Sequence, residues 1–334
     1  MPVQGDRALI LIPSFNDWAA LRLLLPRLDR AMAQVSGWRA SVLVIDDAST
    51  DSLPQDWPGA SYEALEEIAV LHLRCNLGHQ RAIALGLYHA HEFTDAGTVI
   101  VMDADGEDRA EDVPALLEEF ERGGRRDAVF AARAKRMEGF AFQFSYQAYK
   151  LMHWLLTGIE VRVGNFSVLP REALTRLMAV SDLWNHYAAA VYRARLPRRL
   201  LPLARGKRLA GESKMNFVSL LIHGLAAMSV FSDRIAARLL AASAGFAILG
   251  VTMIGWMGMT WAAGAVLAVA AQSLTFAALF ALTIVGRRSA MNFLPLRDAP
   301  HFILGRSVRA VRSSIEPLAR ALAREEIVAG RVRS

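Results

Sequence analysis

The ten residues from Val99 to Asp108, VIVMDADGED, place an apolar strand-forming run directly before acidic residues at 103, 105, 107 and 108. Carboxylates this close together repel one another and resist burial, so a cation or a ligand donor is needed beside them. Hard oxygen ligands of this kind suit a divalent cation. The spacing therefore predicts a metal site at the end of a buried strand.

The elements that must position these acids alternate along the first 135 residues. Apolar runs predict strands at 8–14, 41–47, 69–74, 98–103 and 127–133. Apolar residues at helical spacing predict helices at 17–35, 79–93 and 111–123. This alternation is typical of an α/β domain with a mostly parallel, Rossmann-like sheet covered by helices on both faces.

Polar clusters follow three of the predicted strands, at Asn16 and Asp17, at Asp46 and Asp47, and at Asp103 and Asp105. In parallel sheets, ligands bind beyond the carboxyl ends of the strands. We therefore expect the three clusters to converge on one ligand site. Asp46 and Asp47 also fit an ordinary turn in which Asp and Ser side chains bond their own backbone.

Charge and hydropathy indicate a membrane protein and not a nucleic-acid-binding one. The chain carries a net charge of +6, and residues 287–334, with ten Arg and four acids, supply all of it. The remainder has no basic footprint of the kind that nucleic-acid binding needs. From Leu239 to Gly286, 48 consecutive residues contain no Asp, Glu, Lys, Arg or His, which is enough for two spanning helices.

We expect these helices to turn within Gly255–Gly264, with Trp256 and Trp261 as interfacial anchors. Basic residues flank the apolar run on both sides, so the positive-inside rule places both flanks and both termini in the cytoplasm. Two amphipathic segments, 137–158 and 216–238, are expected to lie at the membrane interface, although either stripe also fits an ordinary core helix.

Four motifs in order, IPSFND, VIDDASTD, NLGHQRAIALGL and DADGED, resemble the GT-A fold of inverting family 2 glycosyltransferases. The later RLAGESKMN, followed by a membrane hairpin, resembles the polyprenyl-phosphate branch of that family, which includes dolichyl-phosphate mannose synthase. The resemblance covers roughly residues 7 to 290. It implies transfer of a hexose, with inversion and Mg²⁺ or Mn²⁺, from a UDP- or GDP-sugar to a polyprenyl phosphate in the cytoplasmic membrane of the cell envelope.

The resemblance also implies roles for individual residues. The metal is assigned to Asp103, Asp105 and Glu107, and catalysis to Asp105, Arg208 and Lys214. The nucleotide-sugar is assigned to Pro13, Asn16, Asp17, Asp46, Asp47, His79, Asp103 and Ala104. The acceptor phosphate is assigned to Arg133, Arg136, Arg208, Ser213 and Lys214.

Some of these assignments have alternatives in the sequence. The family commonly has Gln where Glu107 stands, and Glu107 with Asp108 also fits the acidic start of a helix. His79 fits a structural role as well as a phosphate contact, and Arg136 fits a surface charge. The family's Gly-Ser before Arg133 is Ala131-Ala132 here.

The domain organisation that follows has a catalytic domain at 1–215, an interfacial helix at 216–238, two transmembrane helices at 239–286 and a basic cytoplasmic tail at 287–334. Within the tail, residues 301–311 are predicted to form a strand and 316–326 a helix, which could pair with a neighbouring subunit. The resemblance favours a homo-oligomer, a tetramer above all. Rival functions are a catalytically inactive membrane scaffold and a glycosyltransferase with another lipid acceptor. A processive polysaccharide synthase is a weaker alternative, because this sequence lacks the Q-x-x-R-W signature of those enzymes.

Overall fold

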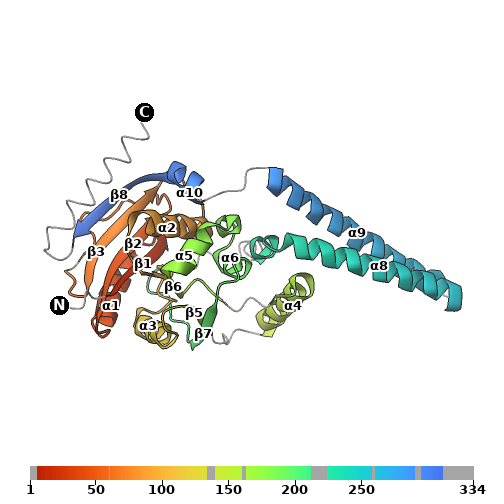
Figure 1. The fold of residues 1–334 in the computed structure, drawn as a ribbon, viewed down its shortest axis with the longest axis horizontal. Coiled ribbons are helices and arrows are strands. Elements are labelled where there is room, and N and C mark those ends of the chain that lie inside the picture. The colour runs from red at the N-terminus through yellow and green to blue at the C-terminus, as the bar shows by residue number, and fades with distance from the viewer. Residues whose placement is uncertain are drawn as a thin grey trace.

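The structure is a computed structural model, and it describes residues 6–59, 61–133, 140–159, 163–211, 224–257, 260–289 and 295–310. Its centre is an eight-stranded sheet with the strand order β7-β5-β6-β4-β1-β2-β3-β8 (Figure 1). The strands are β1 Asp6–Ser14, β2 Trp38–Asp46, β3 Leu65–Leu73, β4 Thr98–Val101, β5 Ala128–Arg133, β6 Ser167–Pro170, β7 Arg198–Leu203 and β8 Ile303–Ala310. All five strands predicted for the first 135 residues are confirmed.

The central strands are parallel, and the strands added later in the chain reverse direction. β1 pairs in parallel with both β2 and β4, and β2 pairs in parallel with β3. β6 runs antiparallel to β4 and to β5, and β8 runs antiparallel to β3. The carboxyl ends of β1, β2 and β4 therefore share one edge of the sheet.

Helices cover both faces of the sheet. α1 (Trp18–Met32) and α3 (Val113–Arg122) pack on one face, and α2 (His79–Phe93), α5 (Arg171–Met178) and α6 (Tyr187–Arg193) pack on the other. Alternate residues of β1 divide between the two cores, as the period of a strand requires: Ile10 faces α1, and Leu11 faces α2. The three helices predicted in this part are confirmed as α1, α2 and α3.

Helix α2 lies close to the sheet because it carries a glycine at the contact. A Cβ atom at Gly86 would lie 2.6 Å from Leu11 Cδ1 and 2.8 Å from Ile45 Cδ1. Only a residue without a side chain fits this approach. The contact fixes α2, and therefore the loop that precedes it, against the strands that carry the polar clusters.

The predicted apolar hairpin appears as two long helices, α8 (Ser232–Met257) and α9 (Thr260–Ser289), which pack side by side and project from the sheet domain (Figure 1). Ser232–Ile254 and Thr260–Phe280 are long and apolar enough to cross a membrane, and few of their residues are buried. Ser243 Oγ donates a hydrogen bond of 2.7 Å to the carbonyl oxygen of Ala270 on the other helix. α8 ends at Met257 and α9 begins at Thr260, and both ends lie inside the predicted turn.

The amphipathic segments are partly described. The first forms α4 (Phe140–Thr157). Of the second, residues 216–223 lie outside the described residues, 224–229 are helical, and α8 begins at Ser232, before the predicted boundary.

After α9 the chain returns to the sheet domain through α10 (Pro295–Asp298) and the 3₁₀ helix η3 (Ala299–Phe302). The predicted strand at 301–311 is confirmed as β8, and it pairs with β3 of the same chain. The predicted helix at 316–326 lies outside the described residues. The partner of this strand is therefore β3 of the same chain.

Candidate active site

The polar clusters after β1, β2 and β4 meet at the shared edge, as the sequence predicts. A basic loop, residues 204–209 after β7, crosses the same edge. Arg208 Nη1 lies 3.0 Å from Asp105 Oδ2, and Arg208 Nη2 lies 3.7 Å from Asp17 Oδ1. One guanidinium group thus links the ends of β1, β4 and β7.

The acidic loop after β4 is held by its own side chains and by the basic loop. Asp108, which is 6% exposed, accepts a 2.9 Å hydrogen bond from the Asp103 amide, and Asp105 Oδ1 accepts one of 2.9 Å from the Glu107 amide. The backbone amide of Leu209 donates to the carbonyl oxygen of Asp105 at 2.8 Å. Gly106 has a φ of +83°, which favours glycine, and a Cβ atom there would collide with Leu209.

Glu107 and Asp108 are not the first-turn acids of the next helix. The 3₁₀ helix η1 (Ala110–Asp112) begins after them, and its own acids are Glu111 and Asp112. Glu107 forms an ion pair with Arg205 of the basic loop. The helix-start alternative for this pair is therefore wrong, and Glu107 is engaged by a cation of the protein.

The carboxyl group of Asp105 has a raised pKa in this site. Burial raises its pKa, the neighbouring Asp103 raises it further, and Arg208 and Arg205 act in the opposite direction without cancelling the rise. A carboxylate in this position favours any added positive charge. Within the described residues, no three His, Cys, Asp or Glu side chains form a cluster that would hold a metal by protein ligands alone.

His79, the first residue of α2, lies against the acidic loop. Its Nε2 lies 3.2 Å from Asp103 Oδ1. Burial disfavours the charged imidazole, but the carboxylates of Asp103, Asp108 and Asp105 outweigh it and raise the pKa of His79. The structure therefore gives His79 a place beside the predicted metal ligands, with its cationic form favoured.

Two residues of this network were missed in the sequence. Asn165 Nδ2 lies 2.9 Å from His79 Nε2 and 3.4 Å from Asp103 Oδ1. Gln80 Nε2 donates to Asn165 Oδ1 at 3.4 Å, and Gln80 Oε1 accepts a 2.7 Å hydrogen bond from the Tyr187 amide. Asn165, just before β6, therefore contacts both His79 and Asp103.

Asp46 and Asp47, at the end of β2, accept hydrogen bonds from other residues of the protein. Asp47 is 3% exposed and accepts hydrogen bonds from the amides of Leu77 and Gly78 at 2.7 and 2.8 Å, which shapes the loop before His79. Asp46 accepts from the Ser49 amide at 2.9 Å and contacts His72 Nδ1 at 3.0 Å. Burial opposes these bonds, but together they lower the pKa of Asp46. The turn-forming interpretation describes the bond between Asp46 and Ser49 but not the bonds of Asp47, which reach a loop 30 residues away. Contact of this pair with a nucleoside stays a prediction.

The first cluster clamps two loops together. Asn16, with a φ of +54°, donates from Nδ2 to Thr50 Oγ1 at 2.8 Å and accepts at Oδ1 from the Asp51 amide at 3.1 Å. Pro13 is buried in β1 opposite Ile45 of β2, and Ala104 is buried between the two acids of the loop. These residues hold the backbone at the edge of the sheet where the other clusters meet.

The predicted acceptor residues are only partly described. Arg133 ends β5 and pairs in register with Leu203 of β7, which sets it beside the start of the basic loop. Arg136, Ser213 and Lys214 lie outside the described residues. Arg205, which was not selected from the sequence, joins Arg208 in that loop. A signal was present in the basic run RGKR, which places Arg205 three residues before Arg208.

An α/β sheet with acids at the carboxyl ends of its parallel strands and a basic loop across them is the GT-A arrangement of a glycosyltransferase. The family described as Glycosyl transferase family 2 matches residues 9–178, just over half of the chain, and the chain belongs to this family.

Similar proteins carry related names. The chain is 26% identical over 321 residues to undecaprenyl-phosphate 4-deoxy-4-formamido-L-arabinose transferase of Klebsiella pneumoniae, covering 90% of this chain and 93% of that protein. It is 24% identical to the uncharacterized glycosyltransferase YkcC of Bacillus subtilis, over 67% of this chain and 68% of that one. Glucosyl-3-phosphoglycerate synthase from Mycobacterium tuberculosis, solved with Mn²⁺ and UDP-glucose, is similar with a TM-score of 0.45 and 16% identity over 69% of this chain and 80% of that one.

Proposed function

We propose that this protein transfers a sugar from a nucleotide diphosphate-sugar to the phosphate of a polyprenyl phosphate at the cytoplasmic face of a membrane. The observation that carries the proposal is the ion pair of Asp105 and Arg208. It brings an acid that suits a metal ion to a cation that suits a phosphate group. The name of the Klebsiella relative, which matches over 90% of this chain, supports a polyprenyl phosphate as the acceptor.

Asp103 and Asp105 are the residues that would hold Mg²⁺ or Mn²⁺. The raised pKa of Asp105, caused by burial and by Asp103, means that the repulsion between these carboxylates is not fully relieved by the protein. Mg²⁺ is usually held by one or two carboxylates together with substrate phosphates, so two acids suffice. Glu107, the third predicted ligand, is already paired with Arg205. A bound ion would supply charge neutralisation for the departing diphosphate.

The reaction that fits these groups is a direct displacement. An oxygen of the acceptor phosphate, anionic at neutral pH, attacks C1 of the sugar, the bond from C1 to the diphosphate oxygen breaks, and its electron pair leaves with the diphosphate. The configuration at C1 is inverted. A phosphate anion needs no strong general base, so the task of the protein is positioning and charge stabilisation.

Each basic group then has a distinct task. Arg208, with Lys214 and Ser213, holds the phosphates that gather beside Asp105, and Arg133 with Arg136 supports the acceptor phosphate. His79, whose Nε2 lies 3.2 Å from Asp103 Oδ1, adds a positive charge beside that carboxylate. The nucleoside rests against Pro13, Asn16 and Asp17, and Asp46 and Asp47 fix the surrounding loops.

Exposed apolar side chains on α4, beside the hairpin, support a membrane location for this helix. On α4, Leu151, Trp154 and Leu155 are more than half exposed. Arg238 of α8 donates to the carbonyl oxygens of Trp154 at 3.1 Å and Leu155 at 2.7 Å, so the end of α4 is fixed to the start of the hairpin. We infer that α4 lies at headgroup depth, where it presents the lipid phosphate to the site.

The remaining features of the proposal concern topology and assembly. Basic residues on both flanks of the apolar run support a two-pass protein with the catalytic domain and both termini in the cytoplasm. The division into a catalytic domain, an interfacial helix, a hairpin and a basic tail belongs to this proposal, with β8 of the tail returning to the catalytic sheet. A homo-oligomer is expected, and a monomeric mass in mild detergent would contradict it.

The proposal is tested by measuring nucleoside diphosphate release from a panel of UDP- and GDP-sugars. Each donor is assayed with and without polyprenyl phosphate, and with and without Mg²⁺ or Mn²⁺. Release that requires both the lipid phosphate and the metal supports the proposal and identifies the donor. Folded protein that releases nothing in any combination contradicts it and favours the scaffold alternative.

A further inference from the structure

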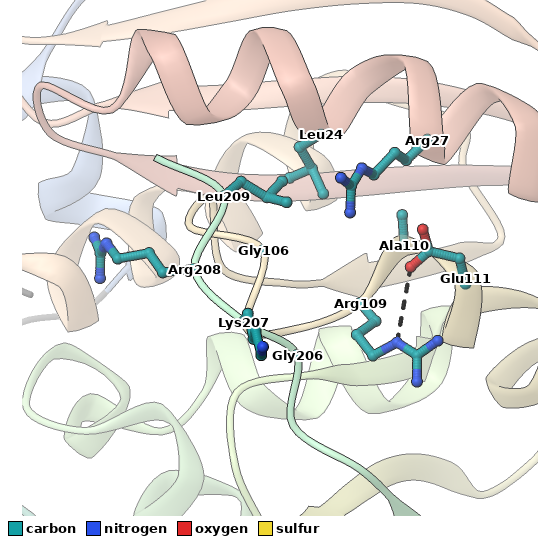
Figure 2. A pocket seen from close by; sticks show the side chains of 10 residues that line it. All are labelled: Leu24, Arg27, Gly106, Arg109, Ala110, Glu111, Gly206, Lys207, Arg208 and Leu209. Atoms are coloured by element: carbon teal, nitrogen blue, oxygen red, sulfur yellow. Dashed lines mark ion pairs between the residues drawn. The ribbon is translucent and has the colours of Figure 1, made fainter. Parts of the chain in front are cut away.

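A cleft of about 420 Å³ lies beside the catalytic edge, between α1, the loop after β4 and the basic loop after β7 (Figure 2). Its walls carry four basic side chains and one acidic one, Glu111. Three of the basic residues that line it are Arg27 on α1, Arg109 after β4 and Lys207 in the basic loop (Figure 2). The volume lies within the range of small-molecule sites.

The cleft is separated from the site at Asp103 and Asp105 by the two loops themselves. The Gly206 amide donates to the carbonyl oxygen of Glu107 at 2.8 Å, and the Leu209 amide donates to that of Asp105 at 2.8 Å. A Cβ atom at Gly206 would lie 2.5 Å from the carbonyl oxygen of Gly106, so the two loops are in close backbone contact. Together they form a wall with a different ligand environment on each side.

Successive side chains of the basic loop are distributed between the two sides of this wall. The guanidinium of Arg208 is directed away from Arg27, Arg109 and Lys207 (Figure 2), and it pairs with Asp105. Lys207 is among the residues that line the cleft. The four cations therefore do not serve one site.

The cations of the cleft are poorly compensated by the protein. Neither Arg27 nor Lys207 has an ion pair or hydrogen bond of its side chain with another residue in the described part of the chain. Arg109 Nε lies 3.9 Å from Glu111 Oε2 and 4.0 Å from Asp112 Oδ2, at the outer limit of an ion pair. Like charges gathered around a hollow repel one another, and a multivalent anion would relieve that repulsion.

The position of the cleft favours a soluble anion over a lipid headgroup. Its wall on α1 belongs to the sheet domain at the end of the molecule away from α8 and α9 (Figure 1). We propose that the cleft is a second anion site, which binds a soluble diphosphate-bearing ligand through Arg27, Arg109 and Lys207, apart from the site at Asp103 and Asp105.

Occupation of this cleft would act on the reaction through its walls. Gly106 follows Asp105, and Lys207 precedes Arg208, so a ligand that fixes both loops changes the freedom of the two residues on the other side. Any such coupling is reciprocal: a ligand at the edge would change the affinity of the cleft by the same factor. The inference goes beyond the proposed function, since it holds whichever acceptor the enzyme uses.

The test is calorimetric titration of the full-length protein in detergent with inorganic pyrophosphate, in EDTA so that no divalent metal is present. We expect binding of one pyrophosphate per chain, weakened at least about tenfold in the double variant R27Q/K207Q, because two charge-assisted contacts are lost. The matched control is Arg30→Gln, one turn further along α1 and bonded only locally to the carbonyl oxygen of Pro26. It should bind like the unchanged protein.

A further variant separates the two sites. Arg208→Gln should keep pyrophosphate binding, because the guanidinium of Arg208 pairs with Asp105 on the other side of the wall. Binding lost in R208Q and retained in R27Q/K207Q would overturn the proposal, as would no binding by the unchanged protein at millimolar pyrophosphate. Parallel titrations with phosphate, UDP and GDP identify the soluble ligand, and preferred binding to vesicles of anionic lipid, abolished by R27Q/K207Q, would overturn its assignment as soluble.

Discussion

Replacement of Arg208 by Gln isolates the group that joins the acidic and basic loops. Arg208 makes a 3.0 Å contact with Asp105 and a 3.7 Å contact with Asp17, and its side chain is 21% exposed. In the proposed reaction the same guanidinium stabilises charge on the phosphates. Loss of one such donor costs about 3 to 4 kcal/mol in a transition state, so kcat/KM should fall about 100- to 1,000-fold.

The change also has a distinctive effect on pH dependence. Burial and Asp103 raise the pKa of Asp105, and Arg208 is the largest influence that lowers it. Without Arg208 the carboxyl group should keep its proton to a higher pH, so the acidic limb of the kcat/KM profile should shift upward. The assay is nucleoside diphosphate release between pH 5 and pH 9, at a fixed metal concentration below saturation, because saturating metal would compete with the proton for Asp105.

A purely structural role would not produce this pattern. R208Q that loses activity with an unshifted acidic limb, or that keeps normal kcat/KM, would refute the reasoning. The control is Arg30→Gln on the exposed side of α1, which removes the same charge far from Asp105 and should leave the profile unchanged. Circular dichroism confirms that both variants are folded.

Three further predictions test other parts of the structure. His72→Gln should lower the free energy of unfolding by about 1 kcal/mol near neutral pH. Because His72 helps lower the pKa of Asp46, this difference from the unchanged protein should shrink as pH falls through that pKa. A difference that stays the same at low pH would contradict this. Gly86→Ala should cost about 1 to 3 kcal/mol by overpacking α2 against the sheet, measured by thermal unfolding, and an unchanged Tm would contradict the close contact. Leu155→Asp should raise KM for polyprenyl phosphate in nanodiscs by roughly fivefold, since a carboxylate at headgroup depth costs about 1 kcal/mol. The control is Leu23→Asp, at a residue of α1 that is 48% exposed. Equal KM values for the two variants would contradict a place for α4 at the membrane interface.

The residues that the sequence located correctly are those at the ends of parallel strands. β1, β2 and β4 read as apolar runs, and their carboxyl ends share an edge whatever their order in the sheet. The meeting of Asp17 and Asp105 at one guanidinium follows from this rule. The apolar hairpin was equally predictable, because an uncharged run of that length has few other stable placements.

The residues that the sequence did not reveal depend on strands that run the other way. β6 has four residues and is antiparallel to β4, with Ser167 opposite Val101. Its beginning therefore lies at the edge where β4 ends, and Asn165, just before it, reaches Asp103. The signal was an Asn after Gly164 and before an apolar run, but strand direction has no local signature in the sequence.

Partners contributed from distant parts of the chain were also hidden. Glu107 was predicted as a metal ligand, and its contact with Arg205 depends on how the loops after β4 and β7 pack. Asp46 reaches His72, whose Nε2 contacts Ser307 Oγ on β8 at 3.0 Å. The separation in sequence is 26 residues for Asp46 and His72 and 235 for His72 and Ser307, so these pairs follow from the topology of the sheet and not from local spacing.

The most direct test of the central claim is the fate of the lipid phosphate. The donor identified by the release assay is incubated with enzyme, metal and polyprenyl phosphate, and the lipid is followed by ³¹P NMR. We expect the phosphomonoester signal to convert to a phosphodiester with the enzyme and not with its Asp105→Asn variant, and the sugar in the product to have an inverted anomeric configuration. Nucleoside diphosphate release with the lipid left as a monoester would contradict the central claim.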